Sequence, residues 1–139
     1  MEFLYIEKAP FAEDFIKLVE STGWQGIVSK ELSKLRESLI NSWYLISVYD
    51  GKDLIGSGRI ISDGILHALI CDLIVLPEYH GRGVGTEILK RLLNKCKAHD
   101  IVMVQLFAAK DKFNYYKKFG FEERPFDAPG MRWIHKDMI

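Results

Sequence analysis

Seven consecutive residues, His80-Gly81-Arg82-Gly83-Val84-Gly85-Thr86, combine the features of an anion-binding turn. They lie between an apolar run typical of a strand and an amphipathic run typical of a helix. Glycines allow a ligand to approach backbone N–H groups closely, and the first turn of a helix adds partial positive charge. Arg82 can add a charge-assisted hydrogen bond to a phosphate. The pattern predicts a pyrophosphate site, with a ligand-free glycine turn as the alternative.

Two other phosphate-binding motifs do not fit this segment. A P-loop requires Lys followed by Ser or Thr after its glycines, and neither pair is present here. A dinucleotide fingerprint requires Gly-x-Gly-x-x-Gly, but counting from Gly81 and Gly83 its third glycine position holds Thr86. The segment also follows the third strand of a predicted meander, whereas a Rossmann unit places it after the first parallel strand.

The sequence around the turn resembles the GNAT superfamily of N-acetyltransferases. The family signature Gln/Arg-x-x-Gly-x-Gly/Ala reads His80-x-x-Gly83-x-Gly85 here. The run from Cys71 to Tyr79 resembles the family's fourth strand and the turn after it, and the run from Tyr115 to Phe121 resembles its Phe-Tyr-x-x-x-Gly-Phe box. The resemblance covers about residues 43–121. It implies an enzyme that transfers the acetyl group of acetyl-CoA directly to a primary amine of a small molecule or peptide.

The resemblance also implies a set of donor-binding residues. Backbone groups of one strand would pair with the pantetheine arm, and backbone amides of the glycine turn would hold the pyrophosphate. His80 departs from the family's Gln or Arg, which leaves the amide cradle intact. The full set expected at the donor site is Leu73, Ile74, Val75, His80, Gly81, Arg82, Gly83, Val84, Gly85 and Thr86.

Two side chains are candidates for the chemical step. Tyr116 matches a family tyrosine that supports the departing thiolate; because a phenol has a reference pKa of about 10 and a thiol about 8.5, a hydrogen bond is favoured over full proton transfer. Packing against Tyr115 and Phe119 is the alternative. The position of a general-base glutamate in some members holds Gln105, so Asp72, in an apolar context that would raise its pKa, is the replacement candidate. The alternatives are that Asp72 is a structural carboxylate that accepts backbone hydrogen bonds, or that a water relay replaces any single base.

Acceptor selectivity is expected from the segments that match the family least. These are the loop Trp24-Gln25-Gly26, the turn at Asp63 and the C-terminal stretch from Pro125 to Gly130. Aromatic and acidic residues there would suit a cationic or aralkyl amine, and ordinary loop chemistry is the alternative.

Periodicity predicts a single mixed α/β domain over residues 1–139, with antiparallel strands first, parallel strands later and flanking helices. A strand, helix, strand unit should place the last two strands side by side in parallel. Ser29 is a candidate N-cap of the second helix. The predicted helices are 11–19, 31–40, 83–98 and 110–119, the last ended by Gly120; the predicted strands are 43–49, 54–61, 65–76 and 101–107, with a further extended stretch from 121 onward.

Composition excludes several function classes. The 19 basic and 19 acidic side chains cancel, so no bulk field favours nucleic acid or an anionic membrane. No run approaches a membrane span, and acidic Glu2 and Glu7 do not suit a signal peptide, which favours a cytoplasmic location. Cys71 and Cys96 lack the spacing of a metal site or redox pair, so we expect reduced thiols and no metal. A homodimer is compatible with the sequence, and a catalytically silent CoA-binding sensor module is the rival function.

Overall fold

The computed structural model describes residues 2–24, 26 and 30–134. Its contacts group into two compact units, residues 1–106 and residues 107–139. The prediction of one acetyltransferase domain therefore stays a prediction. No helix of the described residues is long and apolar enough to cross a membrane.

The first unit is built on a five-stranded sheet in the order β1-β2-β3-β4-β5. The strands are β1 (Leu4–Ile6), β2 (Tyr44–Asp50), β3 (Asp53–Ser62), β4 (His67–Val75) and β5 (Met103–Leu106). The first three pairings are antiparallel, and β4 pairs with β5 in parallel. This confirms the predicted meander and the parallel neighbour. β1 was not predicted, because a strand of three residues is too short to show an alternating pattern.

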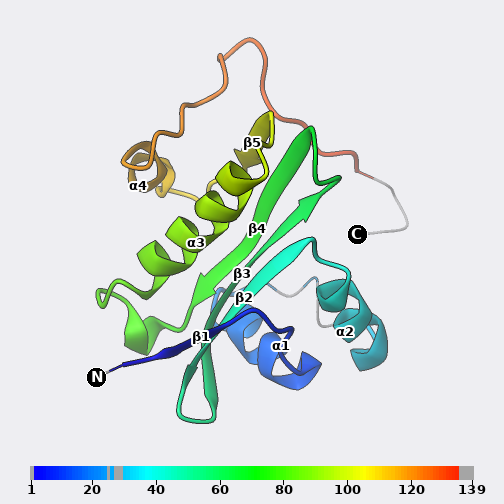
Figure 1. Ribbon diagram of the computed structural model, residues 1–139, viewed down its shortest axis with the longest axis vertical. Coiled ribbons are helices and arrows are strands. Elements are labelled where there is room, and N and C mark those ends of the chain that lie inside the picture. The colour runs from blue at the N-terminus through cyan, green and yellow to red at the C-terminus, as the bar shows by residue number, and fades with distance from the viewer. Residues whose placement is uncertain (1, 25, 27–29, 135–139) are drawn as a thin grey trace. The chain divides into compact units, whose positions relative to one another are not determined.

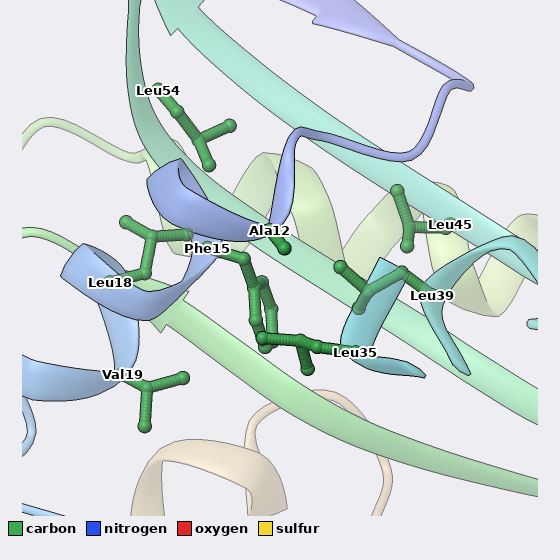
Figure 2. Packing of buried hydrophobic residues seen from close by; sticks show 8 residues of the cluster. All are labelled: Ala12, Phe15, Leu18, Val19, Leu35, Leu39, Leu45 and Leu54. Carbon is green, nitrogen blue, oxygen red and sulfur yellow. The ribbon is translucent and has the colours of Figure 1, made fainter. Parts of the chain in front are cut away.

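Helices cover both faces of the sheet, with α3 (Val84–Ala98) on one face and α1 (Ala12–Glu20) and α2 (Leu32–Ile40) on the other (Figure 1). Gly58 of β3 brings α3 close, because a Cβ at this position would lie 2.7 Å from Ile88 Cγ2. On the opposite face, apolar side chains of α1 and α2 pack on those of β2 and β3 (Figure 2). That cluster contains Ala12, Phe15, Leu18, Val19, Leu35, Leu39, Leu45 and Leu54.

Several predicted boundaries differ from the structure for local reasons. The strand predicted from Ile65 begins at His67, because the Asp63 carboxylate accepts backbone hydrogen bonds from Ile65, Leu66 and His67 and holds them in a turn. Ser29 lies outside the described residues, and the N-cap position of α2 is Glu31, which makes no side-chain cap hydrogen bond.

Over residues 107–134, the second unit contains one short helix, α4 (Phe113–Lys117). It is shorter than predicted because Asp111, with φ +65°, breaks the helical path before it, and Gly120, with φ +94°, follows its end. Within residues 121–134 the chain forms no strand, so the extended stretch predicted there is no sheet strand. Pro125 and Pro129 lack the backbone N–H that a strand ladder requires.

Candidate acetyl-donor site

The two halves of β4 have different neighbours. Residues His67 to Ile70 pair with β3 on one side and with β5 on the other. The ladder to β5 ends at the pair Ile70 and Leu106, whereas β4 continues to Val75. From Cys71 to Val75 the strand is therefore paired with β3 alone among the described strands.

Backbone groups of the second half face alternate sides. Leu76 donates its N–H to the Ile55 carbonyl at 2.9 Å, so the opposed residues Gly56 and Val75 form a non-hydrogen-bonded pair. The backbone groups of Val75 thus point away from β3, while those of Ile74 point toward β3 and its partner Ser57. Of the three residues expected at the pantetheine arm, Val75 presents its backbone outward and Ile74 does not.

The glycine turn begins immediately after the short 3-10 helix η2 (Pro77–Tyr79). Gly81 and Gly83 have φ values of +80° and +79°, a region that favours glycine, and Gly83 is the N-cap of α3. A Cβ built on either glycine meets nothing within 4 Å, so the space beside both is open. The first-turn amides of a helix have no partner within the helix. An open, glycine-lined helix start fits a pyrophosphate.

The Arg82 guanidinium packs on the ring of an aromatic neighbour. Its guanidinium carbon lies 5.2 Å from the centre of the Tyr79 ring, which in turn packs edge-on against Phe3 at 5.5 Å. The Tyr79 hydroxyl donates a 2.7 Å hydrogen bond to Asp50 Oδ2, and this bond raises the pKa of Tyr79. Arg82 itself is exposed, so its charge is available to an anion at the turn.

His80 has a role that sequence reasoning missed. Its Nε2 lies 2.7 Å from the Val75 carbonyl oxygen, and because a carbonyl only accepts, the ring donates this bond. The residue that departs from the family's Gln or Arg therefore ties the glycine turn to the outward-facing end of β4. Because the Val75 carbonyl is bonded to His80, the Val75 N–H is the backbone group that this residue can offer to a ligand as a donor.

Asp72 lies at an irregular point of β4. The register between β3 and β4 shifts between Ser57 and Arg59, and Asp72 has a left-handed φ of +53°. Its Oδ2 accepts a 2.8 Å hydrogen bond from Arg59 Nε. The structure thus gives the carboxylate an ion-pair partner, which suits the structural alternative for Asp72 and leaves its role as a base a prediction.

The cysteines have the surroundings expected of reduced thiols. Cys96 is buried on α3, and Cys71 is partly buried beside Asp72. Burial, with a smaller contribution from the Asp72 charge, raises the pKa of Cys71 to about 11. A thiol that keeps its proton at neutral pH is a poor nucleophile, so this environment does not favour an acyl-cysteine intermediate.

Tyr116 lies on α4 in the second unit. Its ring packs edge-on against Tyr115 at 5.3 Å and Phe121 at 5.9 Å, while Phe119 contacts Tyr115 instead. Burial, followed by the charge of Tyr115, raises the pKa of Tyr116. The phenol therefore stays protonated at neutral pH and can donate a hydrogen bond. Packing and catalysis are both compatible with this environment.

The segments expected to select the acceptor differ in exposure and in hydrogen bonding. Trp24 is 55% exposed after α1, while Gln25 lies outside the described residues. The Asp63 carboxylate already accepts three backbone hydrogen bonds, which lower its pKa. At the C-terminal stretch, Arg124 Nε donates to the Ala128 carbonyl at 2.7 Å and closes a turn. Asp63 is therefore better explained as a turn residue than as a substrate contact.

Comparison with known proteins shows the family of the chain. Residues 12–135 match the family model described as an acetyltransferase (GNAT) domain. The chain is 34% identical to the N-acetyltransferase ycf52 of Pyropia yezoensis over 84% of this chain and 68% of the relative. It is 32% identical to the histone acetyltransferase TAP1 of Glycine max over 86% of this chain and 55% of the relative. The chain thus spans about half to two thirds of the length of these relatives.

A solved structure extends the match to three dimensions. A probable acetyltransferase from meticillin-resistant Staphylococcus aureus superposes with a TM-score of 0.84 at 27% identity, over 96% of this chain and all of that one. The match covers the mixed sheet and the helix that follows the glycine turn. With the family model matching most of its length, the chain belongs to the GNAT acetyltransferase family.

Proposed function

We propose that the chain is an N-acetyltransferase that moves the acetyl group of acetyl-CoA to a primary amine of a small molecule or peptide by direct transfer. Family membership supports acetyl transfer, and the local geometry supports the donor. The observation that carries the proposal is the open glycine turn at the start of α3, joined by His80 to the half of β4 that lacks β5.

The residues of the turn and of β4 bind the donor in this proposal. Backbone N–H groups from Gly81 through Thr86 donate hydrogen bonds to the pyrophosphate oxygens, and Arg82 adds a cation. The outward N–H of Val75 is offered to the amide-containing pantetheine arm. When bound, acetyl-CoA supplies an acetyl thioester whose C–S bond breaks as the C–N bond to the amine forms.

Tyr116 supports the departing sulfur in this proposal. Because its raised pKa keeps the phenol protonated, it donates a hydrogen bond where negative charge develops and need not give up its proton. The proton that the amine loses passes to solvent or to a carboxylate. No cysteine takes the acetyl group, because the Cys71 thiol keeps its proton.

The relatives and the surface indicate which acceptors to test. The soybean relative bears the name histone acetyltransferase, which supports testing lysine peptides beside small amines. Exposed Trp24 supports an acceptor with a cationic or aromatic group.

A silent CoA-binding sensor module is the second candidate. Two observations favour it: Gln105 stands where some family members have a basic carboxylate, and Asp72 is already paired with Arg59. Such a protein would keep the donor site and lack turnover.

One assay separates the two functions. The protein is incubated with acetyl-CoA and a panel of small amines and lysine peptides, and released thiol is measured. Thermal shift with acetyl-CoA alone is measured in parallel, since a ligand that binds the folded state raises Tm. Thiol release with at least one amine supports the enzyme, and a thermal shift without any release supports the sensor. No shift at millimolar acetyl-CoA contradicts both.

A further inference from the structure

Arg59 is a charged residue inside β3 with no role so far among the donor-site residues. It stands between Gly58 and Ile60, and its side chain is 13% exposed. The other charged residue of this strand, Asp53, is at the exposed first position. An arginine removed this far from water needs partners for its guanidinium. Its position in the strand directs it to the face covered by α1 and α2, because neighbouring Gly58 faces α3.

The Arg59 guanidinium joins two elements. Its Nε donates to Asp72 Oδ2 on β4 at 2.8 Å, and its Nη1 donates to Ser42 Oγ at 3.2 Å and to the Ser38 carbonyl at 3.3 Å. Ser38 belongs to α2 and Ser42 follows its end. One side chain therefore fastens the C-terminal end of α2 to the centre of β4.

Asp72 marks the point at which β4 leaves β5. The last pair with β5 is Ile70 and Leu106, and the first residues beyond it, Cys71 and Asp72, lie at the register shift against β3. The left-handed φ of Asp72 is uncommon for a residue with a side chain, although aspartate tolerates it better than most. Such a conformation persists only where the surroundings hold it.

The backbone conformation at Asp72 affects the part of β4 that is proposed to bind the donor. The register shift leaves two residues of β4, Asp72 and Leu73, opposite Gly58 alone, which is a β-bulge. A bulge reorients the strand that follows it, and the residues of β4 after Asp72 are Leu73, Ile74 and Val75. The Val75 carbonyl accepts from His80, so the position of this backbone also affects the glycine turn.

We propose that Arg59 is a positioning residue which, by holding Asp72 in the β4 bulge, sets the backbone edge of Leu73 to Val75 for the donor. The inference rests on the proposed function. It gives Asp72 a positioning role together with Arg59. Neither side chain need touch acetyl-CoA for this role. The expected signature is weaker donor binding with little change in the Michaelis constant for the amine.

The test compares variants that break or keep the pair. Acetyl-CoA affinity is measured by calorimetry for wild type, Arg59→Gln, Arg59→Lys, Asp72→Ala and Asp72→Asn. Loss of the ion pair should weaken donor binding by about tenfold in Arg59→Gln and Asp72→Ala. Arg59→Lys should recover part of the loss because it keeps the positive charge, and Asp72→Asn because its amide oxygen still accepts a hydrogen bond. The double variant Arg59→Gln/Asp72→Ala should lose little more than either single one.

A matched control removes one positive charge from the exposed surface of α2 and leaves Arg59 and Asp72 unchanged. Lys34→Gln breaks an exposed ion pair with Glu37 and should leave donor affinity within twofold of wild type. Amide exchange of Leu73 to Val75 without ligand gives a second readout, and it should be faster in the weak binders. If Arg59→Gln does not fold, Arg59→Lys and the two Asp72 variants carry the same comparison.

The outcomes separate the inference from the proposed function. Wild-type protein that does not bind acetyl-CoA overturns both. Wild-type binding with affinities unchanged in Arg59→Gln and Asp72→Ala overturns the inference alone. So does a fall in kcat for Asp72→Asn at unchanged donor affinity with a lost limb of the pH profile, because that result would make Asp72 the general base.

Discussion

The two halves of β4 differ in their neighbours: one half is paired on both sides, and the other is proposed to bind the donor. Residues His67 to Ile70 are paired on both sides, and their register places β5 in the sheet. Residues Cys71 to Val75 are paired with β3 alone among the described strands, contain the left-handed Asp72, and lead to the glycine turn. Both halves are mostly apolar in sequence, so the difference comes from where β5 ends and from the bulge.

The largest expected effect comes from Gly83, in the glycine turn that follows the second half of β4. Gly83→Val should weaken acetyl-CoA binding roughly a hundredfold or more, since loss of two amide bonds to phosphate costs about 1.5–3 kcal/mol each. A valine at φ +79° is strained, and its side chain would occupy the open space beside the turn. Calorimetry measures the affinity.

Gly23→Val is the matched control for backbone strain. Gly23 has φ +83° and equally open space around an added Cβ, but it lies after α1, away from the glycine turn. Its donor affinity should match wild type. Equal losses in the two variants would mean that general strain, and not the turn, explains the effect.

A smaller effect separates donor binding from the chemical step. Tyr116→Phe should lower kcat by roughly ten- to a hundredfold and leave acetyl-CoA affinity nearly unchanged, because the phenol acts only where thiolate charge develops. The ring contacts with Tyr115 and Phe121 remain, so Tm is the control. Turnover within twofold of wild type would favour the packing role of Tyr116.

A smaller effect is expected for the packing of β3 against α3. Gly58→Ala should lower the free energy of unfolding by about 1–3 kcal/mol, because the new Cβ would lie 2.7 Å from Ile88 Cγ2. Denaturant unfolding measures this cost. Repeating it in an Ile88→Ala background tests the cause: the cost of Gly58→Ala should shrink when Ile88 is truncated. An undiminished cost would mean that another contact is responsible.

The smallest effect concerns the paired end of β4, where Asp63 holds the turn. Three backbone hydrogen bonds lower the pKa of Asp63, so its stabilising contribution is present above the unfolded pKa and is lost as pH falls through the folded value. Wild type should therefore lose more stability than Asp63→Asn between about pH 5 and pH 2. Melting curves across that range check it; parallel curves for the two proteins would contradict it.

Much of the fold could be predicted from the sequence because its signals are local. The amphipathic spacing of α3 and the turns around Gly51 and Asp63 fix the meander and the helix that follows it. β1 could not be predicted because it is too short to show a pattern. That the stretch after Phe121 forms no strand could not be predicted either, because strand pairing depends on partners that periodicity does not reveal. The family resemblance was confirmed by the family model and by the superposed structure.

The site was only partly predictable for a related reason. The glycine turn is contiguous, so its open space and left-handed residues follow from residue type. The bond from His80 to Val75 and the pair of Arg59 with Asp72 join positions that only folding brings together. A lone arginine between Gly58 and Ile60 was a signal that could have been read, because a charge inside a buried strand needs a partner.

Residue-resolved amide hydrogen exchange with and without saturating acetyl-CoA tests the difference between the halves of β4 most directly. The donor should slow exchange at Val75 and at Gly81 to Gly85, whose amides it is proposed to engage. Exchange at His67 to Ile70, which are already paired on both sides, should change little. Bound acetyl-CoA that leaves Val75 and the glycine turn unprotected would contradict the account.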